Sequence, residues 1–177
     1  MIRVVQYDPA WPASFDAEAR RIAERVGGVA VRLHHIGSTA IPQTCAKPII
    51  DILLEATSLV VLDRRAARFE ALGYEAMGEF GIAGRRYYRL DDGKGVRTHQ
   101  LHAFEADTAD VVRHLAFRDY MRAHPAVAAR YGKLKRGLAT RHPNDMDAYI
   151  AGKHAFVREH ERRALCWRSG SGKIQKP

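Results

Sequence analysis

The chain has 177 residues, of which 46% are hydrophobic and 28% charged, and its formal net charge at pH 7 is +9. This length suits one domain with a sizeable core, and the composition excludes a disordered or fibrous chain. No run of about 18 apolar residues is present that would cross a membrane, and the N-terminus lacks the apolar segment of a secretory signal. Cys45 and Cys166 match no metal-ligand spacing, so we expect unpaired thiols and a cytoplasmic location.

Positive charge is concentrated between Val111 and His142, where eight Lys or Arg residues accompany a single Asp. Such a segment can be a solvated helical surface, can attract nucleic acid or a membrane surface, or can steer a polyphosphate into a cleft. The sequence shows no aromatic residues interleaved on one basic face and no known nucleic-acid motif. A solvated surface is therefore favoured, RNA binding stays an alternative, and no membrane partner is expected.

The first half of the chain predicts a helix, two strands and a second helix. Apolar residues at helical spacing predict an opening helix that ends at Gly27-Gly28, with the stripe Phe15, Ala19, Ile22 and Val26. Residues 29–36 predict a strand that leads into a glycine turn. Residues 48–56 predict a nearly continuous apolar strand that is covered on both faces. Residues 59–72 favour a short helix closed by Gly73.

The second half predicts a hairpin followed by helices. Two strand-like runs within residues 85–105 flank Asp91-Asp92-Gly93, which is a hairpin signal. Everything from Asp107 onward is helical in pattern, and the last helix is expected to begin at Asn144 as its cap. This order indicates an α+β domain with a helical C-terminal half. We expect one domain over residues 1–165 and a disordered tail over residues 166–177.

The turn Gly37-Ser38-Thr39 is a candidate phosphate-binding element. It offers backbone N–H groups, two hydroxyls and no bulky side chain at Gly37, which together suit the close approach of phosphate oxygens. It is not the P-loop motif, which requires a Gly-Lys-Ser/Thr ending. A tight turn that caps a helix is the alternative interpretation.

Asp51 is the only charge within an apolar strand, where an unpaired carboxylate is costly. It therefore needs a metal, the Lys47 amine or N–H donors as a partner. Leu53 occupies the position two residues on where a two-carboxylate magnesium site would have its second acid. Glu55 shares the face but lies roughly 13 Å further along the strand. Magnesium holds its ligands at about 2.1 Å, so Glu55 cannot share an ion with Asp51.

Several motifs together carry a resemblance to a known family. They are Y-D-P-A-W-P at 7–12, H-I-G-S-T-A-I-P at 35–42, K-P-I-I-D-I at 47–52, L-A-F-R-D-Y at 115–120, L-K at 134–135, R-H-P-N-D at 141–145 and A-Y-x-x-x-K at 148–153. Over about residues 5–160 the chain resembles the GrpB-like family. That family is similar to the polymerase-β-like nucleotidyltransferases, and some of its members are fused to dephospho-CoA kinase.

The resemblance implies a nucleotidyltransferase-like fold, in which a small mixed β-sheet is flanked by helices. It also implies transfer of a nucleotidyl group from a triphosphate, with magnesium on carboxylates and a Gly-Ser turn at the phosphates. Gly37 and Ser38 match that turn, and Asp51 matches the first carboxylate. The chain departs from the family pattern at Leu53, which replaces the second carboxylate. It also has Gln100-Leu101-His102 where the family often has His-Leu-His.

Further candidates come from strand and helix periodicity. Gln100 and His102 alternate onto one face and His99 onto the other, so His102 becomes a metal ligand or base if its strand lies beside Asp51. At most one of the adjacent Arg85 and Arg86 faces a phosphate. Lys153 interrupts the aromatic stripe that begins at Tyr149, so it either lines the cleft or extends to water.

The sequence therefore predicts a nucleotidyltransferase-like enzyme that uses ATP or a related triphosphate with magnesium and a small-molecule acceptor. Asp51 and His102 are the expected catalytic and metal-binding residues. The expected phosphate-binding residues are Gly37, Ser38, Thr39, Lys47, Arg86 and Lys153. Two alternatives remain: an adenylating ligase, in which a carboxylate attacks the triphosphate, and a degenerate, non-catalytic domain that binds a nucleotide, a CoA-like ligand or RNA.

Overall fold

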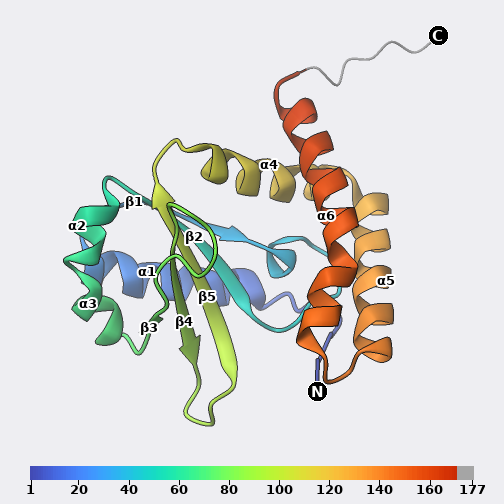
Figure 1. Cartoon of the computed structure of the whole chain (residues 1–177), viewed down its shortest axis with the longest axis horizontal. Helices are drawn as coiled ribbons and strands as arrows, with labels where there is room; N and C mark the ends of the chain where they lie inside the picture. The colour runs from blue at the N-terminus through green and yellow to red at the C-terminus, as the bar shows by residue number, and fades with distance from the viewer. Residues whose placement is uncertain (171–177) are drawn as a thin grey trace.

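A five-stranded mixed sheet forms the centre of the structure, a computed structural model in which residues 1–170 are described (Figure 1). Its strands are β1 (Ala30–Ile36), β2 (Ile50–Ala56), β3 (Glu75–Ala76), β4 (Arg86–Asp91) and β5 (Arg97–Glu105), in the order β1-β2-β5-β4-β3. The central pair, β2 and β5, is parallel, and the other neighbours are antiparallel. The predicted hairpin is confirmed as β4–β5, and the α+β class is confirmed.

Helices cover both faces of this sheet (Figure 1). They are α1 (Trp11–Val26), the one-turn 3-10 helix η1 (Ser38–Ala40), α2 (Leu59–Asp63), α3 (Ala66–Glu70), α4 (Ala109–Ala123), α5 (Pro125–Arg141) and α6 (Met146–Arg168). The first, second and third α-helices pack on one face around a large apolar core that includes Ile22, Ile52 and Phe69. The fourth lies across the other face, and α5 and α6 pack against it and beside the sheet.

The alternation along β2 decides what reaches each face. Ile50, Ile52 and Leu54 enter the core beneath α1. Leu53 points the opposite way and packs with Phe104 and Val111 beneath α4. Asp51 and Glu55 share the face of Leu53, one on each side of it. The carboxylate of Asp51 therefore emerges at the end of the strand nearest to α5 and α6.

Three details differ from the sequence-based expectation. The helix expected over residues 59–72 is divided into α2 and α3, because the Arg65 amide donates to Leu62 O only three residues back (2.9 Å) and turns the chain. The cap of α6 is Asp145, whose carboxylate accepts from the Ala148 amide (2.9 Å), rather than Asn144. The α6 helix continues to Arg168, past the boundary expected at 165.

The remainder of the expected tail, residues 171–177, lies outside the described residues. Within the described part of the chain, none of the helices combines the length and the apolar character that crossing a membrane requires.

Candidate functional site

The glycine turn and Asp51 form one packed unit at the end of β1. Gly37 follows β1 with φ of +68°, a backbone conformation that favours glycine. A Cβ atom added there would lie 2.9 Å from both Cβ and Cγ of Asp51. The Thr39 hydroxyl donates to Ile49 O (3.3 Å) and also contacts His35 Nε2 (2.9 Å). The turn is thereby fixed against the residues on either side of it.

A cavity of about 190 Å³, here called the lysine pocket, opens beside this turn. The turn, the start of β2, one β5 side chain and the facing sides of α5 and α6 all contribute to its wall. Its lining residues are Gly37, Ser38, Thr39, Ala46, Lys47, Ile49, Asp51, Gln100, Tyr131, Lys135, Tyr149 and Lys153. Three lysines thus share the pocket with one carboxylate, which leaves it with an excess of positive charge.

Two glycines allow the helices that carry these lysines to pack closely. On α5, a Cβ at Gly132 would lie 3.3 Å from the Cys45 backbone nitrogen, so the helix contacts the loop before Lys47. On α6, a Cβ at Gly152 would lie 3.3 Å from Leu138 Cγ, so α6 packs onto α5. The close approach brings Lys135 and Lys153, from neighbouring helices, into the same cavity.

Lys135 is the most unusual of the three lysines. Its side chain is almost completely buried, and in the described structure its Nζ has no hydrogen-bond partner. The amine lies 4.4 Å from the centre of the Tyr131 ring, a cation–π contact. Burial, and then the charge of Lys153, lower the pKa of Lys135 to about 7. A buried amine without a counter-charge is destabilising unless an anion arrives.

The other two lysines lie over one tyrosine ring. Lys153 Nζ is 4.6 Å and Lys47 Nζ is 5.8 Å from the centre of the Tyr149 ring. Burial and the charge of Lys47 lower the pKa of Lys153 to about 8. Burial also lowers the pKa of Lys47, an effect that the Asp51 charge partly opposes. Each of these lowered pKa values would rise again if a polyanion bound in the pocket.

His102 lies near Asp51 but is not one of the residues that line the lysine pocket. Its Nε2 lies 3.7 Å from Asp51 Oδ1, and its Nδ1 lies 3.5 Å from Arg85 Nη1. Arg85 is buried, and its other donors bind backbone carbonyl oxygens. A guanidinium can only donate, so its approach to Nδ1 favours the tautomer with hydrogen on Nε2. In that tautomer the Nε2–H is directed to the side of Asp51, but at 3.7 Å the two groups are neighbours and not hydrogen-bonded partners.

The residues around Asp51 fit one magnesium ion shared with a phosphate. Magnesium in proteins is commonly held by one or two carboxylates together with substrate phosphates and water. The Gln100 side chain lines the same pocket, and Gln100 is the register partner of Asp51, so its amide oxygen is a second candidate ligand. Leu53 is fully buried beneath α4. Within residues 1–170 no cluster of three or more His, Cys, Asp or Glu side chains could hold a metal.

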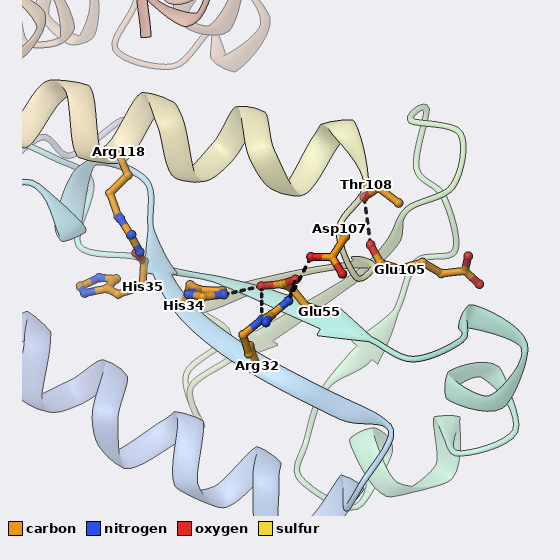
Figure 2. Close-up of polar contacts among 8 residues, drawn as sticks. All are labelled: Arg32, His34, His35, Glu55, Glu105, Asp107, Thr108 and Arg118. Atoms are coloured by element: carbon orange, nitrogen blue, oxygen red, sulfur yellow. Dashed lines mark hydrogen bonds and ion pairs between the residues drawn. The ribbon is translucent and has the colours of Figure 1, made fainter. Parts of the chain in front are cut away.

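Glu55 has a structural role at the other end of β2 (Figure 2). Its carboxylate accepts two hydrogen bonds from Arg32 (2.9 Å each) and contacts His34 Nε2 (2.6 Å), while Arg32 also reaches Asp107 (3.2 Å). These contacts, with Arg32 making the largest contribution, lower the pKa of Glu55 to about 2. Glu55 therefore links β1 to β2 and takes no part in the lysine pocket.

The structure gathers most of the sequence-predicted site residues in one place. The turn residues 37–39, Lys47, Asp51 and Lys153 line the lysine pocket, and His102 adjoins it through Asp51. Arg86 lies elsewhere, which corrects its expected role in phosphate binding. It makes a two-pronged contact with Asp63 (2.6 and 2.8 Å), because adjacent strand residues point to opposite faces and Arg85 takes the side of His102.

Sequence reasoning missed the α5 side of the pocket, and it also did not assign Gln100, Ala46 or Ile49 to the site. Tyr131 and Lys135 are four residues apart on α5, so they share one helical face. The signal was a lysine on the buried stripe of that helix, within the Leu-Lys motif at 134–135.

Known proteins resemble this chain over nearly its whole length. The model of the family described as "GrpB protein" matches residues 1–163. The UPF0157 protein YqkA of Bacillus subtilis is 41% identical over 96% of this chain, which spans about half (49%) of YqkA's length. The crystal structure of the conserved protein GrpB from Enterococcus faecalis is 42% identical and superposes with a TM-score of 0.89, covering 94% of this chain and 99% of that one.

A more distant likeness concerns the fold alone. The Cid1 poly(U) polymerase, solved with MgATP bound, superposes with a TM-score of 0.55 at 14% identity, over 84% of this chain and 50% of that one. This agrees with the nucleotidyltransferase-like fold, a small mixed sheet flanked by helices. The family-model match and the Enterococcus faecalis structure show that the chain belongs to the GrpB family.

Proposed function

We propose that the protein is a nucleotidyltransferase-like enzyme that binds ATP or another nucleoside triphosphate with magnesium and transfers the nucleotidyl group to a small-molecule acceptor. One observation carries the proposal: the lysine pocket holds three lysines and one carboxylate beside a Gly-Ser turn, and one of these lysines is buried without a partner. A polyphosphate supplies the negative charge that this arrangement lacks.

The size of the pocket suggests which part of a nucleotide enters it. Pockets for whole drug-sized ligands have volumes of roughly 300–1,000 Å³. The lysine pocket, at about 190 Å³, has room for the phosphates while the ribose and base lie outside. Affinity should therefore depend on the number of phosphates more than on the identity of the base.

The proposed reaction forms a bond between the acceptor hydroxyl oxygen and the α-phosphorus. The bond from that phosphorus to the oxygen of the β-phosphate breaks, pyrophosphate leaves and the hydroxyl proton is lost to a base or to water. In this scheme Lys47, Lys135 and Lys153 stabilise charge on the departing phosphates. Asp51 lies beside them, and a magnesium ion there would offset phosphate charge.

Distant structural relatives support a nucleotide as the substrate. One Cid1 structure contains MgATP, and terminal uridylyl transferase 4 from Trypanosoma brucei was solved with dUTP bound.

Leu53 favours a second candidate function, a domain that binds a nucleotide without transferring it. An apolar residue buried under α4 occupies the position where a second carboxylate would stand.

Calorimetry with magnesium and ATP, ADP or AMP tests the binding part of the proposal. We expect affinity to fall from ATP to ADP to AMP, and Lys153→Gln to weaken ATP binding about tenfold, which corresponds to roughly 1.4 kcal/mol. Arg86→Gln is the matched control, since Arg86 pairs with Asp63 outside the pocket and should bind ATP as the wild type does. Equal affinity for AMP and ATP, or an unaffected Lys153→Gln protein, would overturn it.

Transfer itself needs a separate measurement. ATP labelled at the α-phosphate should pass its label to small molecules of a cell extract, whereas ATP labelled at the γ-phosphate should not. The Asp51→Asn protein should give no such transfer. If the wild type gives no more labelling than the extract without protein while ATP still binds, the protein is a nucleotide-binding domain and not a transferase; equal transfer by the Asp51→Asn protein would contradict the role of Asp51.

A further inference from the structure

A second cavity lies on the other side of the glycine turn, between α1 and α4. Its volume is about 370 Å³, and we call it the α1–α4 pocket. The lining residues used below are Tyr7, Phe15, His35, Ala40, Arg118 and Arg122. Tyr7 and Arg118 come from the motifs at 7–12 and 115–120, neither of which contributes to the lysine pocket.

Two arginines form the α4 side of this pocket. Arg118 and Arg122 are one helical turn apart, where like charges disfavour the helix. Arg118 donates to His35 O (3.2 Å) and to Asp119 (2.7 Å), while Arg122 Nε donates to Ala40 O (2.8 Å). In the described structure Asp119 is therefore the one carboxylate in contact with the two guanidinium groups. The carbonyl contacts fix the guanidinium positions but do not neutralise them.

Aromatic rings form the α1 side. Phe15 stacks on His35 with ring centres 5.0 Å apart and planes inclined by 6°. Tyr7 is held edge-on against Trp11, with ring centres 5.3 Å apart. Burial lowers the pKa of His35 to about 4, so the imidazole is neutral at physiological pH. The exposed Asp16 carboxylate also borders the pocket on the α1 side, so an anionic group is favoured only at the arginines.

We propose that the α1–α4 pocket binds a small ligand that carries a carboxylate or phosphate on a flat ring. The anion would contact Arg118 and Arg122, whose forked donors suit planar or tetrahedral oxyanions. The ring would lie against Tyr7 and Phe15. A volume of about 370 Å³ is within the range of small-molecule sites, roughly 300–1,000 Å³. This site does not depend on the proposed nucleotide site: the two pockets share no lining residue and are joined through the contact of Thr39 with His35.

Nuclear magnetic resonance of the full chain tests the proposal with three probes: benzoate, phenyl phosphate and the neutral benzyl alcohol. The readout is the Nε–H signals of Arg118 and Arg122. We expect saturable shifts of both signals at millimolar benzoate or phenyl phosphate and none with benzyl alcohol. Binding of only one anion would support the proposal and identify the ligand as a carboxylate or as a phosphate.

Three variants separate the two pockets. Arg122→Gln keeps side-chain N–H donors but removes the charge, and it should weaken binding of the anion about tenfold, roughly 1.4 kcal/mol. Phe15→Leu, which removes a flat ring, should also weaken it. Lys153→Gln, in the lysine pocket, should bind like the wild type. Loss of binding in Lys153→Gln but not in Arg122→Gln, equal shifts with benzyl alcohol, or no shifts with any probe would each overturn the proposal.

Discussion

Gly37 and Asp51 are packed so closely that a methyl group on Gly37 would lie 2.9 Å from both Cβ and Cγ of Asp51. The candidate phosphate turn and the candidate metal carboxylate therefore act as one unit, and neither can be altered without moving the other. The positive φ of Gly37 adds a second reason why this position favours glycine.

Gly37→Ala should accordingly lower the free energy of unfolding by about 1–3 kcal/mol, since it combines backbone strain with a clash against Asp51. ATP binding should weaken at the same time and no longer be tightened by magnesium, because the turn and the carboxylate are displaced. Gly28→Ala is the matched control: no atom lies within 4 Å of a Cβ there, and the change should be below about 0.5 kcal/mol. Urea unfolding of both variants measures this, and equal destabilisation would contradict the packing argument.

Lys135→Met should stabilise the protein near pH 7 and weaken ATP binding. The pKa of Lys135 is about 7 when folded and near its ordinary value of 10.5 when unfolded. Between these values the unfolded state binds more protons, so the Lys135 contribution makes stability rise with pH. The variant lacks this contribution, and its unfolding free energy should rise less steeply from about pH 7 to pH 10.

Lys133→Met is the control for that measurement, since Lys133 is an exposed lysine on the same helix. Its stability profile and its affinity for ATP should follow the wild type. If both variants show the same profile, the buried amine of Lys135 is not the cause of the pH dependence.

Glu55→Gln should lower the free energy of unfolding by about 2 kcal/mol at neutral pH, because charged hydrogen bonds from Arg32 and the His34 contact are weakened. The folded-state pKa of Glu55 is about 2, below its ordinary value of 4.5. Its stabilisation is thus complete above about pH 5 and is lost as the pH falls toward 2. The difference between wild type and variant should shrink over that window in thermal unfolding.

Asp107→Asn tests whether the Glu55 effect is specific. Asp107 is exposed and contacts Arg32 from outside the strand pair (Figure 2). The variant should change stability by less than about 0.5 kcal/mol. A loss as large as that of Glu55→Gln would show that Arg32, rather than the buried carboxylate, dominates the cluster.

His102→Gln distinguishes a partner of Asp51 from a metal ligand. If His102 is a neighbour of Asp51 outside the lysine pocket, the variant should keep the effect of magnesium on ATP binding and lose only a few-fold in affinity. Calorimetry with and without magnesium measures this. Loss of the magnesium effect in a folded His102→Gln protein would instead make His102 a ligand.

The parts of the fold that depend on local pattern could be predicted from the sequence. The glycine turn, the isolated Asp51 and the hairpin are all local signals, and the first two mark the centre of the candidate site. Which of Arg85 and Arg86 faces the site could not be predicted from the sequence, because it depends on the register in which β4 pairs with β5. That register places Tyr87 opposite His102 and turns Arg86 toward Asp63.

Lys135 shows a different limit. Its burial depends on the contact of α5 with the loop before Lys47, made possible by Gly132, which is a long-range relationship. The sequence already shows that position 53 is a leucine and not a carboxylate. The physical reason is that α4 covers this position, where an apolar side chain is buried. Packing between distant segments, rather than local pattern, decides both positions.

The most direct test of the central claim is calorimetry of ATP binding, with and without magnesium, to the wild type and to Asp51→Asn. We expect magnesium to tighten binding to the wild type and to have no such effect on the variant, which should still bind ATP through its lysines. Equal binding with and without magnesium in both proteins would contradict the role of Asp51. If ATP does not bind the wild type at all, the lysine pocket is not a triphosphate site.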